Sequence, residues 1–130
     1  MLEVKNASLQ IDGDMLFQNL SFSVGDGEML CVTGPSGAGK TTLLRAILGF
    51  QPLDEGYISI DGELLTPSSA GEFRKTMAYV PQDIALPAER VSDLCAMLSG
   101  LRANRGVALS KERLMEEWGR LGLVDGIFVF

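Results

Sequence analysis

A glycine-rich run at residues 34–42 constrains this chain more than any other feature of its sequence. The run consists of Gly34, Pro35, Ser36, Gly37, Ala38, Gly39, Lys40, Thr41 and Thr42. Its glycines allow positive φ angles and leave no Cβ in the way, so successive backbone N–H groups can curl around a phosphate. Residues 29–32, just before it, are all apolar, and apolar residues at helical spacing follow it. The run therefore predicts a polyphosphate-binding loop between a buried strand and a helix.

Two side chains at the end of this loop complement the backbone amides. We expect Lys40 to bring a positive charge to the β- and γ-phosphates, and Thr41 to offer a hydroxyl oxygen to Mg²⁺. The helix that starts near Gly39 adds its N-terminal amides and the positive end of its dipole. The alternative is a glycine-rich turn with no ligand. A chance match to the whole pattern in a chain of this length has odds on the order of one in a hundred, which favours the phosphate-binding interpretation.

The composition narrows the class of protein further. With 130 residues, 46% apolar and 22% charged, the chain is expected to be one globular domain. Its 17 acidic and 11 basic residues leave a net charge of −6, so no nucleic-acid partner is expected. Cys31 and Cys95 lie among apolar residues and are predicted to be buried thiols in a reducing cytosol. Neither a membrane span nor a secretory signal is recognisable, and there is no histidine to act in catalysis.

Apolar patterning predicts the strands. Alternation predicts strands over residues 2–11 and 20–24, with a turn between them. Residues 29–32 and 77–80 are continuously apolar, which predicts two short strands buried on both faces. Residues 57–60, followed by an Asp-Gly pair, predict a strand that enters a hairpin.

Three helices are predicted. The first begins after the loop and ends at Gly49, which stands where a C′ glycine closes a helix. From residue 91 the apolar period becomes helical, with Ser92 as the expected N-cap of the second helix. Ser110 is the expected cap of a third helix, whose apolar stripe includes Trp118 and which closes at Gly122. Both stripes are expected to be core.

Several protein families carry this phosphate-binding loop, so neighbouring motifs must distinguish them. The Asp-x-x-Gly and Asn-Lys-x-Asp motifs of switch GTPases are absent, and about 30 residues of strand pattern precede the loop, unlike the arrangement usual in nucleotide kinases. Four motifs occur in order: residues 19–28, residues 34–44, residues 56–62, and Tyr-Val-Pro-Gln at residues 79–82. This ordered set resembles the nucleotide-binding domain of ATP-binding cassette (ABC) transporters over about residues 2–123.

The resemblance implies an α/β fold with a P-loop NTPase core, an antiparallel β N-terminal subdomain and a partial helical subdomain, incomplete relative to the family. About residues 1–82 would form the β-subdomain and core, and about residues 88–123 the helical subdomain. The implied function is an ATP-binding subunit that couples ATP binding and hydrolysis to transport, with ATP and Mg²⁺ as cofactors. The implied location is cytoplasmic, at the membrane face. The implied partners are a transmembrane permease, contacted through residues after Gln82, and a second ABC subunit.

The resemblance also assigns residues outside the loop. Ile11 stands where the family has an aromatic residue that stacks on adenine, so we expect it to press an aliphatic side chain on the base. Gln82 is implied to be catalytic together with Lys40, and to reach Mg²⁺ as Thr41 does. Without the resemblance, Gln82 is better interpreted as a solvated loop glutamine that follows a strand-ending proline.

Three catalytic elements of the family are missing from these 130 residues. They are the Leu-Ser-Gly-Gly-Gln signature, the Walker B strand that ends in Asp-Glu, and the switch histidine. We therefore expect the chain to bind nucleotide without hydrolysing ATP on its own, and residues 29–32 to lack a neighbouring strand along one side. Two alternatives stay open: a non-catalytic, nucleotide-sensing P-loop module, and another P-loop enzyme such as a nucleotide kinase.

Overall fold

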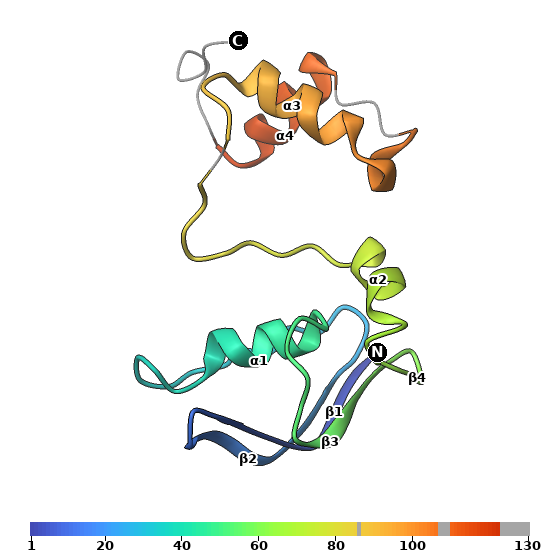
Figure 1. Ribbon diagram of the computed structural model, residues 1–130. Helices are drawn as coiled ribbons and strands as arrows, with labels where there is room; N and C mark the ends of the chain where they lie inside the picture. The colour runs from blue at the N-terminus through green and yellow to red at the C-terminus, as the bar shows by residue number, and fades with distance from the viewer. Residues whose placement is uncertain (86, 107–109, 123–130) are drawn as a thin grey trace. The chain divides into compact units, whose positions relative to one another are not determined.

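The computed structural model describes residues 1–85, 87–106 and 110–122. The chain divides into two units, Met1–Tyr79 and Val80–Phe130. The first unit contains a four-stranded antiparallel sheet in the order β2-β1-β3-β4 (Figure 1). The strands are β1 (Leu2–Ile11), β2 (Asp14–Val24), β3 (Glu55–Ile60) and β4 (Glu63–Leu64).

Local sequence explains why these strands pair in this way. Asp12 and Gly13 both have positive φ angles, as a tight turn between two twisted antiparallel strands requires. Val4 on β1 lies opposite Phe22 on β2 and Ile58 on β3, so apolar side chains line one face across three strands. The predicted strands at residues 2–11 and 57–60 are confirmed, and the one at residues 20–24 is the second half of β2.

Two asparagines interrupt the β1–β2 ladder. Asn6 and Asn19 each have a φ angle of 50°, and the register of the ladder shifts beside them. Each backbone amide finds a hydroxyl on the opposite strand: Asn6 donates to Ser21 Oγ at 2.8 Å, and Asn19 donates to Ser8 Oγ at 3.0 Å. The hydroxyls thus replace ladder hydrogen bonds that the irregular register removes.

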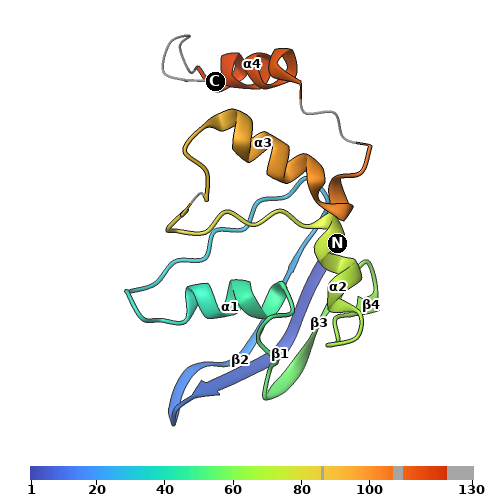
Figure 2. The same cartoon turned by 45° about the horizontal axis from the view of Figure 1, so that its top comes forward.

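Helix α1 (Lys40–Ile47) lies along one face of this sheet (Figures 1 and 2). Its residue Ala46 joins Val4, Ala7 and Ile58 in the buried core. The predicted helix after the glycine-rich loop is confirmed, and so is its end, because Gly49 has a φ angle of +71° and donates to Ala46 O at 2.9 Å. After β4 come the short helix α2 (Ala70–Phe73) and the 3₁₀ turn η1 (Arg74–Thr76).

Two sequence predictions about the first unit and its junction are wrong. Residues 29–32 and 77–80 form no strand, and Cys31 is exposed rather than buried. A strand buried in a parallel sheet needs partners that lie far away in sequence, and no described segment pairs with either stretch. The expectation that residues 29–32 have an unpaired side is in line with their exposure.

The second unit contains α3 (Val91–Gly100), the 3₁₀ turn η2 (Arg102–Asn104) and α4 (Lys111–Arg120). Ser110 caps α4 as predicted, its Oγ accepting from the Arg113 amide at 3.2 Å. Ser92 is not the cap of α3, because the extended residue before the helix is Arg90.

Burial in the second unit also differs from the prediction. None of its described residues is buried, so Cys95 and Trp118 are half-buried instead of core. Amphipathic helices bury their apolar stripe only where another element covers it. Across the described ranges, no helix is both long and apolar enough to cross a membrane.

Candidate nucleotide-binding site

The backbone of residues 34–39 forms a loop that leads into α1, whose first turn contains residues 40–42. Gly37 and Gly39 both have φ angles of +82°, a conformation in which a residue with a side chain would be strained. The Ala38 amide donates to Pro35 O at 3.2 Å, which closes a turn inside the loop. Gly39 stands at the N-cap and provides no side-chain cap. The first amides of α1 have no acceptor within the helix, so they are available to an external anion.

The ammonium group of Lys40 lies within this loop. Its Nζ donates to the carbonyl oxygens of Gly34 and Pro35, both at 2.7 Å. These contacts hold one positive charge beside the amides at the start of α1, where the helix dipole is also positive. The arrangement attracts anions and offers several donors at once, as a polyphosphate requires.

Strand β2 supports the loop at Gly39. A Cβ atom built on Gly39 would lie 3.0 Å from Leu16 Cβ and 3.6 Å from Phe17 Cδ1. Sequence reasoning missed this contact, because nothing in the sequence marks these two apolar residues as neighbours of the loop. Any side chain at position 39 would have to displace β2 or move the loop.

Some of the other predicted site residues lie beside the loop and others lie away from it. Thr41 is exposed and Thr42 half-buried, both in the first turn of α1. Ile11 is the last residue of β1, opposite Asp14, and is 36% exposed. The structure therefore brings Lys40, Thr41 and Thr42 together with the loop. Gln82 is exposed in the second unit, in a segment without helix or strand.

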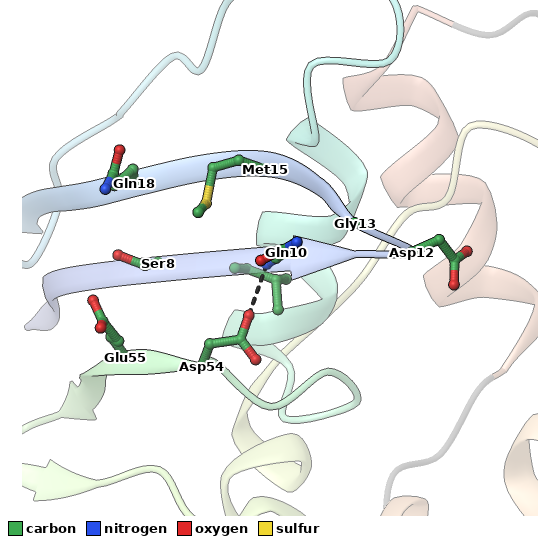
Figure 3. A pocket seen from close by; sticks show the side chains of 9 residues that line it. Ser8, Gln10, Asp12, Gly13, Met15, Gln18, Asp54 and Glu55 are labelled. Atoms are coloured by element: carbon green, nitrogen blue, oxygen red, sulfur yellow. Dashed lines mark hydrogen bonds between the residues drawn. The ribbon is translucent and has the colours of Figure 1, made fainter.

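A second concavity lies at the β1–β2 hairpin and the start of β3, with a volume of about 410 Å³. Figure 3 shows Asp54 directed at the backbone of β1, where it accepts a hydrogen bond from the Gln10 amide at 2.7 Å. Asp12 and Glu55 also line this pocket. Three carboxylates repel a polyphosphate, so the loop is the better phosphate site of the two.

The residues at the loop also fit a magnesium ion bound together with phosphate. Within the ranges that the structure describes, no group of three or more His, Cys, Asp or Glu side chains is placed to hold a metal. Mg²⁺ in nucleotide sites takes only one or two ligands from protein and the rest from phosphate and water. The exposed Thr41 hydroxyl suits that role, with the loop holding the phosphates.

Comparison with known proteins identifies the class. The family model described as ABC transporter matches residues 17–123. A solved ATP-binding subunit of an ABC transporter is 29% identical, with a TM-score of 0.68 over 92% of this chain and 48% of that one. A putative ABC transporter ATP-binding protein from Pyrococcus furiosus, 22% identical, superposes with a TM-score of 0.76 over 95% of this chain and 58% of its own, which supports the fold. The chain belongs to the ABC transporter family, as part of its ATP-binding domain.

Two relatives place the chain within that family. It is 34% identical over 125 residues to the cytochrome c biogenesis ATP-binding export protein CcmA of Hahella chejuensis, covering 95% of this chain and 56% of the relative. It is 32% identical over 136 residues to an uncharacterized ABC transporter ATP-binding protein of Methanocaldococcus jannaschii, covering 98% of this chain and 24% of that one. The chain thus spans about half the length of the first relative and less of the second.

The family assignment confirms the fold class predicted from the sequence, with its antiparallel sheet and partial P-loop NTPase core. ATP-binding domains of this family bind ATP, usually with Mg²⁺. They are typically cytoplasmic, and they generally dimerise and act with transmembrane components.

Proposed function

We propose that residues 34–42 bind the phosphates of Mg·ATP and that this chain is the nucleotide-binding part of an ABC transporter subunit. The single observation that carries the proposal is the position of the Lys40 ammonium, 2.7 Å from two carbonyls of the loop. From there a rotation of the side chain brings the charge to a phosphate held by the amides of Gly37 and Gly39 and of the first turn of α1.

Each remaining site residue has a proposed role. Thr41 supplies its hydroxyl to Mg²⁺, and the amides of Lys40, Thr41 and Thr42 donate to phosphate oxygens. Ile11 contacts the base from the end of β1. Gln82 is proposed to reach the metal and the attacking water. Lys40 and Gln82 are the residues proposed to act in catalysis.

Hydrolysis and transport extend the proposal to the whole protein. Phosphoryl transfer needs a group that orients the attacking water, and the signature, Walker B and switch-histidine motifs are not found in these 130 residues. We infer that the 130 residues bind nucleotide without steady turnover. In the complete assembly, a transmembrane permease contacts the residues after Gln82, and a second ATP-binding subunit faces the nucleotide. A cytoplasmic location at the membrane surface follows from that assembly.

Calorimetric titration with Mg·ATP tests the proposal. The chain is expected to bind with a measurable Kd, and Lys40→Ala is expected to weaken binding at least about tenfold, since a charge-assisted hydrogen bond contributes about 1.5–3 kcal/mol. Lys75→Ala is the matched control, because Lys75 is an exposed lysine in the same unit whose ammonium group pairs with Glu72 at 2.7 Å. Equal Kd values for the two variants would contradict the proposed role of the loop.

A phosphate-release assay separates the family function from its alternatives. If the chain is part of a transporter's ATP-binding subunit, it is expected to hydrolyse ATP once the part of a relative's sequence that this chain does not span is added to it. A nucleotide-sensing module is expected to bind ATP without any such gain. Steady phosphate release by the 130 residues alone, lost in Lys40→Ala, would overturn the inference that this chain does not turn over.

A further inference from the structure

The C-terminal end of α1 is closed by two backbone hydrogen bonds and one side chain from a later segment. Gly49 donates to Ala46 O and Phe50 donates to Arg45 O, both at 2.9 Å, which is the Schellman arrangement. That arrangement leaves the carbonyl of Leu48 free to accept another donor. The Arg74 guanidinium supplies it, with Nη1 donating to Leu48 O at 3.0 Å in a partly buried position.

The segment from Ala70 to Arg74 makes two further contacts with this end of the helix. The Arg74 guanidinium carbon lies 4.6 Å from the centre of the Phe50 ring, within range of a cation–π interaction. A Cβ atom on Gly49 would lie only 2.6 Å from Ala70 Cβ, and Ala70 is 2% exposed. The segment from Ala70 to Arg74 is therefore packed tightly on the end of α1.

Helix α1 connects this contact to the phosphate-binding loop. Eight helical residues rise about 12 Å and behave as one short rod, so a displacement at one end moves the other. The two ends also have opposite partial charges. The N-terminus attracts the phosphate and the C-terminus attracts the Arg74 cation.

Residues 77–79 follow Arg74 almost directly and lie against α1. Met77, Ala78 and Tyr79 line an apolar groove of about 290 Å³ together with Leu44 and Leu48 of the helix region. They have no strand partner among the described residues. Leu2 of β1 and Ile60 of β3 complete the lining of this groove, so side chains of the sheet and of α1, together with the link through Arg74, position residues 77–79.

We propose that Arg74 is a positioning residue that makes residues 77–79 follow α1 when the loop binds nucleotide. This inference rests on the proposed function, because it requires Mg·ATP at the loop. The described contacts of Arg74 lie at the end of α1 opposite the loop. Arg74 acts through the Leu48 carbonyl and the Phe50 ring at that end of the helix.

Amide chemical shifts during a Mg·ATP titration test this coupling. In the wild-type chain, the amides of residues 37–41 and those of residues 77–79 are expected to shift together with one Kd. In Arg74→Met, which keeps the apolar stem but loses the charge and its donors, the shifts at residues 37–41 are expected to persist and those at residues 77–79 to fall more than about twofold. Arg74→Lys retains a donor and a positive charge and is expected to restore part of the response.

The controls separate coupling from simple unfolding. Lys75→Met removes the neighbouring exposed cation and is expected to leave both sets of shifts unchanged. Phe50→Leu removes the ring under the guanidinium while Leu48 O still accepts, so a partial loss at residues 77–79 is expected. Unchanged amide dispersion of β1 and β3 verifies that each variant is folded.

The possible outcomes distinguish the two proposals. Absence of shifts at residues 37–41 in the wild-type chain would overturn the proposed function, and this inference with it. Shifts at residues 37–41 without any at residues 77–79, or equal shifts at residues 77–79 in wild type and Arg74→Met, would overturn only the role of Arg74.

Discussion

Apolar and polar residues alternate along the strands of the antiparallel sheet, whereas residues 29–32 and 77–79 are continuously apolar, yet it is the sheet that contributes the buried side chains. Val4, Ala7 and Leu9 on β1 are exposed by 1% or less. Leu30 is 47% exposed and Met29 is 97% exposed. Hydrophobicity alone therefore does not decide which segment becomes core.

The source of the partner strand explains the difference. Strand β1 has a partner on both edges: a tight turn joins it to β2, and β3 returns from later in the chain to pair antiparallel with its other edge. A parallel strand needs a partner that returns after a crossover. Helix α1 shows both situations at once: Leu43 and Ala46 are buried, whereas Leu44 is 45% exposed and lines an apolar groove. Among the described residues, a segment is buried where another part of the chain supplies its partner strand or covering helix.

Hydrogen exchange is expected to show the widest contrast between the two regions. Amides in the centre of β1 should open only on global unfolding, with a free energy of about 5 kcal/mol or more. Amides of residues 30–32 should exchange close to the rate of an unstructured chain, because no described strand pairs with them. Strong protection of residues 30–32 measured by NMR would break the comparison.

Gly56→Ala is expected to produce the largest loss of stability within the sheet. Gly56 has a φ angle of +80°, and a Cβ there would lie 2.3 Å from Lys5 O and 2.4 Å from Asn6 O. The backbone of β1 cannot yield without breaking its pairing with β3, so we expect a loss of about 4 kcal/mol in urea unfolding. Gly62→Ala is the matched control, since Gly62 has a similar φ angle but open space, and about 1 kcal/mol is expected.

A pair of leucine truncations compares the two regions directly. Leu9→Ala removes a side chain that is 1% exposed and is expected to cost about 3 kcal/mol through lost burial and a cavity. Leu30→Ala makes the same chemical change at a site that is 47% exposed, where about 0.5 kcal/mol or less is expected. Similar losses from both variants in denaturant unfolding would show that residues 29–32 are packed in solution.

A smaller effect than that of Leu9→Ala is expected in α4, which buries none of its described residues and depends on its cap. Ser110→Ala should reduce helix stability by about 1 kcal/mol, because the Arg113 amide loses its acceptor. The Cα chemical shifts of residues 111–120 measure this loss. A helix population unchanged by the substitution would show that other contacts stabilise α4.

Acidification tests the same helix end. Hydrogen bonds from its own backbone amide and then from the Ser110 side chain lower the pKa of Glu112. A lowered pKa means that the carboxylate stabilises the folded helix above its unfolded pKa, and that this contribution disappears as the pH falls through the folded value. The helix population should therefore decrease on acidification in wild type and vary less with pH in Glu112→Gln.

Local patterns predicted the parts of the fold that depend on local contacts. Alternation identified β1, and the glycine at position 49 correctly marked the end of α1, because a C′ glycine needs only its own helix. Ser92 failed as a cap because Val91 is already helical and the extended conformation falls on Arg90. The strand predicted at residues 29–32 is wrong because a strand also needs a partner, and the local pattern of apolar residues does not show whether one is present.

In the candidate site, too, the contacts within a short stretch of sequence were predictable and those between distant residues were not. The loop residues and Lys40 follow from a contiguous motif whose geometry is local, and the structure brings them together. The support of Gly39 by Leu16, and the contact of Arg74 with the far end of α1, join residues distant in sequence. No periodicity or spacing indicates such contacts, so only the structure reveals them.

The two carbonyl contacts of Lys40 have a consequence for ligand selection. A ligand must offer the ammonium group more than it loses by leaving two neutral oxygens, each already at 2.7 Å. A singly charged anion compensates poorly for that loss, whereas a triphosphate with several adjacent negative charges repays it easily. Under the proposed function, the resting contacts of Lys40 would favour a triphosphate over a singly charged anion, whatever base the nucleotide carries.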